Sequence, residues 1–450
     1  MDRSKMLAEE STGKLLWSFS LPAIIGMMVS ALYNVVDSIF VGNGVGPIGL
    51  TAVTIAFPLM IVMMGFGMLV GLGSTALVSI RLGEKKMDEA ENILGNAVSA
   101  MVLIAAVLTA VFLIFLEPIL LMLGAEPDVL PYAKQFATII VAGSIFQYIG
   151  LSINNIIRAE GNPKIAMASM LISAILNTIL NPTFIFLLHM GIRGSALATV
   201  ISQAVTSIWV LSYFLGEKSL LKLRRKYLRI KKDIIMKIIS IGMAPFLMQI
   251  AASVVTVLFN YKLIKYGGDM AVAAMGVINR VSMLTLMPIF GINQGAQPII
   301  GFNYGAKNYD RVKDVLKKAV IAASLVCIVG FILIQVFSRD IIRIFNNNAE
   351  LIDIGSNGLK IMMFMLPIIG FQIVSSNYFQ AIGKATHSIF LSLSRQVILL
   401  IPLIAILPGF FGLHGIWLAG PSADFGSSII TGIFLFIELG KLRDLHEQNA

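Results

Sequence analysis

Long apolar stretches separated by short polar segments form the main pattern along this chain of 450 residues. Each stretch has about 20 or more residues, which is the length that an α-helix needs to cross the hydrocarbon core of a bilayer. The pattern predicts twelve transmembrane helices. They run over residues 15–42, 48–80, 94–116, 133–158, 165–188, 194–215, 235–264, 271–300, 315–337, 357–381, 387–407 and 413–438.

The second half of the chain repeats the first at a nearly constant offset. Gly73, Gly83, Lys85, Asp88 and Gly161 recur as Gly295, Gly305, Lys307, Asp310 and Gly383. Six helices per repeat is an even number, so both repeats enter the membrane from the same face and are parallel. We therefore expect an all-α polytopic membrane protein with two parallel six-helix repeats around a central cavity, as in secondary transporters.

Basic residues predict the orientation of these helices. If the termini and the loops after even-numbered helices share one side, that side holds 25 of the 34 lysines and arginines, and the other side holds seven. Because basic loops stay in the cytoplasm, we expect both termini there. Residues 216–233 then form a basic cytoplasmic linker between an N-terminal lobe, 1–215, and a C-terminal lobe, 234–450.

Composition agrees with a chain that lies in the cell (cytoplasmic) membrane. It is 57% hydrophobic and only 13% charged, and the net charge of +10 follows from the loop bias. No basic patch is interleaved with aromatic residues, so we expect no nucleic acid partner. The single cysteine, Cys327, permits no intrachain disulfide, and no phosphate-binding loop or catalytic constellation is present. We expect a monomer without a cofactor or enzymatic activity.

Five short segments carry a resemblance to a known family. The most specific, 294–307, reads QGAQPIIGFNYGAK, and the others are VDSIFVG at 36–42, RAEGNPK at 158–164, SRQ at 394–396 and PSAD at 421–424. Together they resemble the multidrug and toxic compound extrusion (MATE) family, nearest its bacterial and archaeal exporters, over residues 15–440. The resemblance implies two six-helix lobes that export organic cations, driven by inward flow of protons or sodium ions.

A polar layer is predicted in the outer part of the first lobe. Asp37, Asn177, Asn181 and Thr199 lie at similar depths in their helices. A carboxylate inside a bilayer costs at least about 2.5 kcal/mol, which makes Asp37 a functional candidate. The layer could bind sodium, or it could be a hydrogen-bond network around a carboxyl that binds a proton. The two asparagines could also simply join helices.

The resemblance supports a coupling role for these four residues, because the family's first-lobe cation site uses matching positions. Many relatives have an aspartate at the position of Asn181, so a pair of carboxylates is not available here. The choice between H+ and Na+ stays open.

The second lobe carries a different set of charges near mid-membrane: Arg280, Arg395 and Asp424. The simplest interpretation is a salt bridge of Asp424 with Arg395 or Arg280 that fixes helix packing. If Asp37 is not the coupling group, Asp424 is the next candidate.

Flexible methionines and polar side chains on helices 1, 2, 4, 8 and 10 are candidates for a substrate cavity that accepts many shapes. They are Met27, Met63, Gln147, Asn154, Asn279, Met283, Gln294, Gln372 and Asn377. The methionines could equally be ordinary lipid-facing residues. The sequence thus predicts antiport of small cationic or amphiphilic drugs through alternating access. The alternative is a flippase for lipid-linked precursors, which would want a basic cavity supplied by Arg280 and Arg395.

Overall fold

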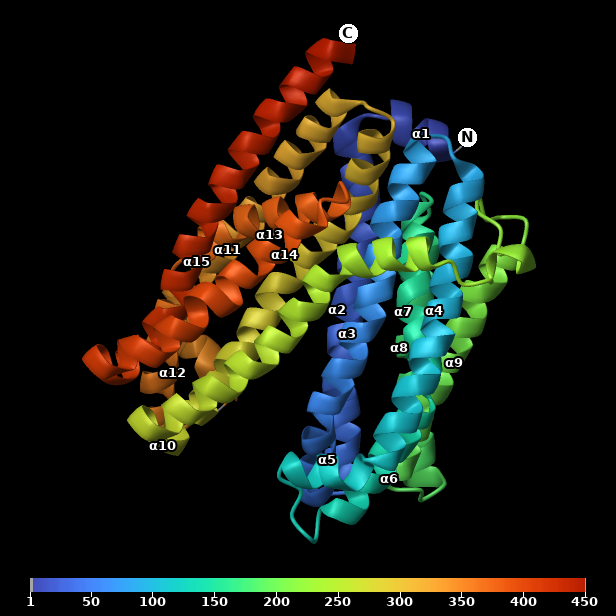
Figure 1. The fold of residues 1–450 in the computed structure, drawn as a ribbon. Coiled ribbons are helices and arrows are strands. Elements are labelled where there is room, and N and C mark those ends of the chain that lie inside the picture. The colour runs from blue at the N-terminus through green and yellow to red at the C-terminus, as the bar shows by residue number, and fades with distance from the viewer. Residues whose placement is uncertain (1–2, 346, 450) are drawn as a thin grey trace. The chain divides into compact units, whose positions relative to one another are not determined.

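The computed structural model describes residues 3–345 and 347–449, and this part of the chain contains helices and no strand (Figure 1). The elements of the first half are α1 (Arg3–Glu9), α2 (Thr12–Gly44), α3 (Pro47–Gly83), α4 (Met87–Ile114), α5 (Leu116–Met122), α6 (Leu130–Ala142), α7 (Ser144–Ala159), α8 (Pro163–Pro182), a π-helical turn η1 (Thr183–Leu187) and α9 (Ile192–Leu215).

The second half follows after a short 3-10 turn, η2 (Arg225–Tyr227), in the linker. Its elements are α10 (Lys232–Gly305), α11 (Tyr309–Phe345), α12 (Ala349–Met362), α13 (Leu366–Ala381), α14 (Ala385–Leu393), a π-helical turn η3 (Ser394–Leu400) and α15 (Ile401–Asn449).

The twelve predicted spans can be identified in the described residues. Eight helical segments are long and apolar enough to cross a membrane, and the bent pairs α6–α7 and α12–α13 add two spans. Non-helical backbone at Gly268 divides α10 into two helices, and non-helical backbone at Gly412 divides α15 in the same way. These two divisions bring the number of spans in the described residues to twelve. The fold class is therefore confirmed. The bends of 49° and 50° in the fourth and tenth spans were not predicted.

The duplication is visible in the backbone itself. Gly191 has φ 55° and ψ −135°, and Gly412 has φ 55° and ψ −134°. Lys85 and Lys307 both have φ 60°, although a lysine rarely adopts the left-handed region. Each of these lysines lies two residues after the last residue of a helix, and the same hydrogen bond caps both helices. The N–H of Lys86 donates to the carbonyl oxygen of Arg81 at 2.9 Å, and the N–H of Asn308 donates to that of Asn303 at 2.8 Å. The repeats thus share their breaks as well as their sequence.

Two compact units make up the described chain, and each contains a segment from the other half of the sequence. The first unit is α1 with Ile25–Phe246, and the second is Glu10–Ile24 with 247–449. In the first unit α3 packs against α4 and α7, and α9 packs against α7 and α8 (Figure 1). In the second unit α11 packs against α12 and α13. The division into lobes at 1–215 and 234–450 stays a prediction.

Glycines allow the exchanged segments to pack closely. In the first unit, a Cβ atom on Gly242 of α10 would overlap the carbonyl oxygen of Leu69 in α3. In the second unit, a Cβ atom on Gly295 would lie 2.7 Å from the backbone nitrogen of Ser20 in α2. Small residues permit such backbone contact between membrane helices. The same kind of crossing therefore fixes α10 in one unit and α2 in the other.

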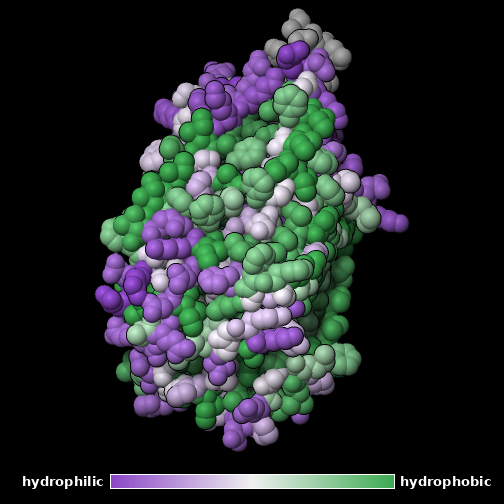
Figure 2. Space-filling view, turned by 90° about the vertical axis from the view of Figure 1, so that its left-hand side faces the viewer, coloured by the Kyte–Doolittle hydropathy of each residue, from purple (hydrophilic) through white to green (hydrophobic). Residues whose placement is uncertain are grey.

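Apolar side chains remain exposed on the outer helices. Along α15, Phe425, Ile429, Ile433 and Phe436 are exposed at intervals of three or four residues, so they share one helix face. Figure 2 shows apolar side chains, in green, over a broad part of one face of the protein, with polar side chains gathered at its upper end and left edge. Such a surface is expected where helices contact lipid.

The glycine crossing in the first unit can be tested with two matched substitutions in α10. Gly242→Ala should lower the melting temperature, because overpacking at a tight contact costs about 1–3 kcal/mol. Gly276→Ala should leave it unchanged or raise it, because nothing lies within 4 Å of the added Cβ atom. Thermal unfolding in detergent measures both effects. Equal melting temperatures for the two variants would contradict the proposed crossing.

Candidate functional site

The predicted polar layer is assembled in the first unit from three helices, α2, α8 and α9. Asn181 in α8 donates a hydrogen bond from Nδ2 to Oδ1 of Asp37 in α2. Asn177, one turn earlier, donates from Nδ2 to Oγ1 of Thr199 in α9 at 3.2 Å. Asn181 is fully buried and Asn177 nearly so, whereas Asp37 and Thr199 are half-buried. The structure thus brings all four predicted residues together.

A fifth residue, Ser195, completes this cluster. Its hydroxyl donates to Oδ1 of Asp37 at 3.3 Å, and its side chain is fully buried. Ser195 and Thr199 are four residues apart on α9, as Asn177 and Asn181 are on α8, so each pair lies on one helix face. Because the two helices are consecutive and antiparallel, Ser195 is level with Asn181. That spacing was available in the sequence and could have identified Ser195.

The chain prepares this geometry locally. α8 ends at Pro182, directly after Asn181, and continues as the π-helical turn η1. A proline inside a helix removes a backbone hydrogen bond, and π-helical turns widen the helix at sites of function.

One oxygen atom in the cluster has no partner. Oδ1 of Asn181 is buried and accepts no hydrogen bond from the described residues. A buried polar atom without a partner costs about 1–3 kcal/mol. The cluster therefore combines a negative charge, two amides and two hydroxyls with a free acceptor. This set suits either a cation or a transferred proton, and its role in coupling stays a prediction.

The predicted substrate-cavity residues have varied surroundings. Met63, Asn154 and Gln372 are buried, and Asn154 donates to the carbonyl oxygen of Ala166 at 2.9 Å. Asn377 donates to the carbonyl oxygen of Ile373 within its own helix at 3.0 Å. The others are exposed or half-buried: Met27, Gln147, Asn279, Met283 and Gln294. Their contact with substrate stays a prediction.

In the second unit, the choice between two arginines is decided. Nε of Arg395 donates to Oδ1 of Asp424 at 2.5 Å. Arg280 is exposed and forms no ion pair with Asp424. Arg395 lies in the π-helical turn η3 and Asp424 in α15, so the pair joins two successive spans.

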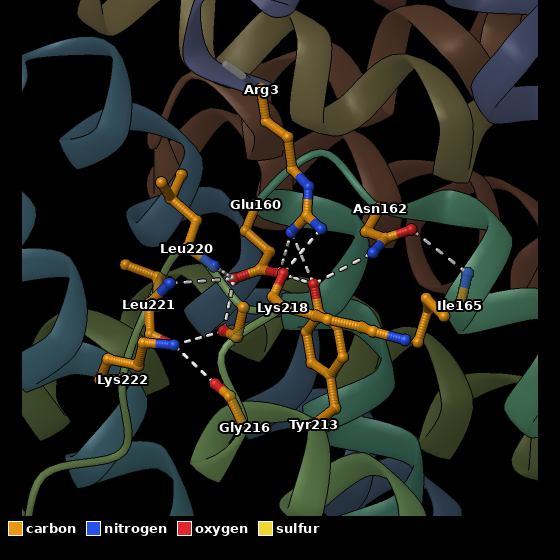
Figure 3. Close-up of polar contacts among 11 residues, drawn as sticks. Arg3, Glu160, Asn162, Ile165, Tyr213, Gly216, Lys218, Leu220, Leu221 and Lys222 are labelled. Carbon is orange, nitrogen blue, oxygen red and sulfur yellow. Dashed lines mark hydrogen bonds and ion pairs between the residues drawn. The ribbon is translucent and has the colours of Figure 1, made fainter. Parts of the chain in front are cut away.

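A buried carboxylate, Glu160, lies directly after α7 and binds three separate parts of the first unit (Figure 3). Nη1 of Arg3 in α1 donates to its Oε1 at 2.8 Å, and the hydroxyl of Tyr213 in α9 donates to the same oxygen. Its Oε2 accepts from the Ser219 hydroxyl at 3.0 Å and from the backbone N–H of Leu221 at 3.1 Å. Glu160 thus ties the N-terminal helix and the start of the linker to α9.

Burial has a further effect on this carboxyl. It raises the pKa of Glu160 above the usual value, while the hydrogen bonds from Tyr213 and Leu221 and the charge of Arg3 oppose the rise. Glu160 should therefore take up a proton at a higher pH than an exposed glutamate does. Protonation would remove its charge and weaken its attraction for Arg3.

Comparison with known proteins adds to this geometry. The MatE family profile matches residues 22–183 and again 244–406. The spacing between the starts of the two matches coincides with the offset of the repeat. Together the two matches cover well over half of the chain.

Relatives align over nearly the whole length. The multidrug export protein MepA of Staphylococcus haemolyticus is 27% identical over 408 residues, which are 91% of this chain and 90% of that protein. The structure of the MATE multidrug transporter DinF-BH is 40% identical, with a TM-score of 0.88 over 94% of this chain and 95% of its own. A MOP superfamily transporter from Pyrococcus furiosus has the same fold, with a TM-score of 0.93 at 23% identity over 98% of this chain and 99% of its own.

The contact between Glu160 and Arg3 predicts that α1 detaches as the pH falls. In a Cys327→Ser background, we compare maleimide labelling of Leu7→Cys, at a buried position, with labelling of Lys5→Cys, at an exposed one. The labelling ratio of Leu7→Cys to Lys5→Cys should rise from mildly alkaline to mildly acidic pH, as Glu160 gains a proton. The ratio cancels the intrinsic pH dependence of the thiol reaction.

Adding Arg3→Gln should raise this ratio at every pH and flatten its pH dependence, because the ion pair is then absent throughout. A ratio that is the same with and without Arg3→Gln would show that Glu160 does not hold α1 in place.

Proposed function

Because the chain belongs to the MatE family of multi-pass membrane transporters, we propose that it is a secondary active exporter of small cationic and amphiphilic drugs. Export is coupled to the inward flow of protons or sodium ions, and both termini lie on the cytoplasmic side of the cell membrane. The chain works as a monomer. The names of MepA and DinF-BH, a multidrug export protein and a multidrug transporter, support the substrate class.

The observation that carries this proposal is the contact of Asp37 with Asn181 and Ser195. A carboxylate inside a membrane span is costly, and here it is held by neutral donors, with no basic residue among its hydrogen-bond partners in the described part of the chain. Its negative charge therefore remains available to a mobile cation. A cation that neutralises Asp37 changes the relative stability of two conformations only by its differential affinity for them.

Either coupling ion can be accommodated by the same residues. For a proton, Asp37 becomes a neutral acid and donates to an oxygen, and the free Oδ1 of Asn181 is the adjacent acceptor. For sodium, the carboxylate of Asp37, the amide oxygens of Asn177 and Asn181 and the hydroxyls of Ser195 and Thr199 supply the oxygen atoms. In both cases the amide of Asn181 turns its oxygen toward the site in place of its NH2 group.

The duplicated architecture supports alternating access as the transport mechanism. Parallel repeats in transporters rock as rigid bodies about a site between them. Binding of the coupling ion to Asp37 would favour one arrangement of the repeats, and binding of the drug the other. The matched relatives named as multidrug exporters favour this function over the alternative, a flippase for lipid-linked precursors.

The first prediction for this function concerns Asp37. Asp37→Asn should retain the fold but reduce gradient-driven efflux of a cationic dye to the level of empty vesicles, because the charge that binds the ion is gone. The assay uses proteoliposomes with imposed proton and sodium gradients, each applied separately. Asp128→Asn makes the same chemical change in an exposed loop and should transport normally. Wild-type efflux by Asp37→Asn would exclude Asp37 as the coupling group.

The second prediction concerns Asn181. Asn181→Asp places a second carboxylate against Asp37, and two adjacent carboxylates retain one shared proton. We expect the pH profile of transport to shift to more alkaline values, while Asn177→Ala and Thr199→Ala only weaken coupling. The profile is measured as initial efflux rate against external pH. An unchanged profile for Asn181→Asp would show that the two side chains do not act together.

A further inference from the structure

A recess of about 210 Å³ opens in the second unit, between α10, η3 and α15. Its walls are mainly apolar and include Phe259, Met275, Met362 and Met363. Methionines and aromatic rings adapt to ligands of different shape. Apolar walls with a few polar groups are typical of sites that bind small organic molecules.

The repeat relates this recess to the Asp37 cluster of the first unit. Phe259 occupies the position that matches Asp37 under the offset that relates Gly73 to Gly295. Gly420 matches Thr199 under the slightly shorter offset that relates Gly191 to Gly412. Phe259 and Gly420 both line the recess. The second unit thus has a hollow at the positions that match Asp37 and Thr199, where the carboxylate and the hydroxyl have been replaced by a phenyl ring and a glycine.

Both members of the ion pair line this recess, and the arginine is the more exposed of the two. The side chain of Arg395 is 31% exposed, whereas that of its partner Asp424 is 5% exposed. Arg395 uses Nε for Asp424, and its terminal amino groups have no hydrogen-bond partner among the described residues. Arginine often pairs with a carboxylate through two parallel N–H donors, whereas Arg395 uses one. The two terminal amino groups of Arg395 can therefore donate hydrogen bonds to a ligand.

Neighbouring groups add to the binding capacity of the recess. Oε1 of Gln396 is buried without a partner in the described part of the chain. Asn260 and Asn279 also line the recess, and the described residues supply no hydrogen bond to either side chain. These amides can orient a polar head group once Arg395 has neutralised its charge. Arg395 and Gln396 both lie in η3, and π-helical turns of this kind are frequent at functional sites.

We propose that this recess is a second ligand site, which binds the anionic head group of an amphiphile on Arg395 and packs its apolar part against Phe259 and the methionines. The site rests on the proposed transport function and extends its substrates to molecules with a carboxylate. Small-molecule pockets usually measure about 300–1,000 Å³, so the recess holds the head group and the adjacent ring of a larger ligand.

Binding of two matched dyes to purified protein in detergent tests the site without any ion gradient. One probe is a xanthene dye with a free carboxylate, and the other is the ethyl ester of the same dye. The double variant Arg395→Gln/Asp424→Asn removes both charges, so no buried carboxylate is left unpaired. It should weaken binding of the carboxylate dye by about tenfold or more, since a hydrogen bond to a charged group has about that effect.

The ester should bind equally well to the wild type and the double variant. Arg395→Lys keeps the charge but loses the planar fork, and should weaken carboxylate binding by a smaller factor. Arg343→Gln removes an exposed arginine of the same unit and serves as the control. Unchanged binding of the carboxylate dye to the double variant, or an equal loss for both dyes, would overturn the proposal.

Competition identifies the natural source of the head group. Displacement of the dye by short-chain phosphatidylglycerol would assign the site to a membrane lipid, and displacement only by soluble carboxylates would assign it to an exported solute. Displacement by phosphatidylcholine as well would overturn the proposal, because the site would then not select a negative charge. Dye binding in detergent needs no ion gradient, whereas the transport proposal is tested by gradient-driven efflux, so failure of the transport proposal and failure of this one are distinguishable.

Discussion

The absence of water in the hydrocarbon core is the constraint on which this structure depends. Backbone groups there must be paired with other protein groups, and the helical spans of this protein meet that requirement within each segment. Charged side chains there need hydrogen-bond or ion-pair partners from the protein. Asp37 has neutral hydrogen-bond donors, and Asp424 forms an ion pair with Arg395. The first uses amides and hydroxyls and leaves a negative charge open to a cation. The second uses an opposite charge and leaves arginine donors open to an anion. The two repeats thus meet a charge inside a span by different means, the first with neutral donors and the second with an ion pair.

The sequence predicted the architecture well because its signals are local or periodic. Twelve apolar stretches and a nearly constant repeat offset identify spans and repeats without tertiary information. The depth of each residue in its predicted helix was enough to predict that Asn177, Asn181 and Thr199 lie near Asp37. Ser195 was missed although it obeys the same four-residue spacing, because a serine in a membrane helix usually bonds its own backbone.

Other features depend on helix rotation and bending, which hydropathy does not report. Arg280 and Arg395 have similar depth, and only the direction that each side chain takes from its helix decides which one meets Asp424. Met63 and Asn154 are at plausible depths for a cavity but are buried in the structure. The bend between α6 and α7 at Gly143 leaves the apolar stretch unbroken, so the sequence predicted one straight span.

The placement of the linker indicates where the chain can bend if the repeats rock. The start of the linker is held by Glu160, and its end is held at Lys231, whose N–H donates to Oδ1 of Asn96 at 2.7 Å. Both contacts lie within the first unit, so the linker is not free to act as a hinge between the units. The chain passes between the units first between Glu9 and Glu10, after α1, and then twice inside helices, after Ile24 in α2 and after Phe246 in α10. Pro22 and Pro245 lie next to these two points, and each removes a backbone hydrogen bond from its helix. A helix weakened by proline where it passes from one unit to the other can change its kink at low cost while the glycine crossings within each unit stay fixed.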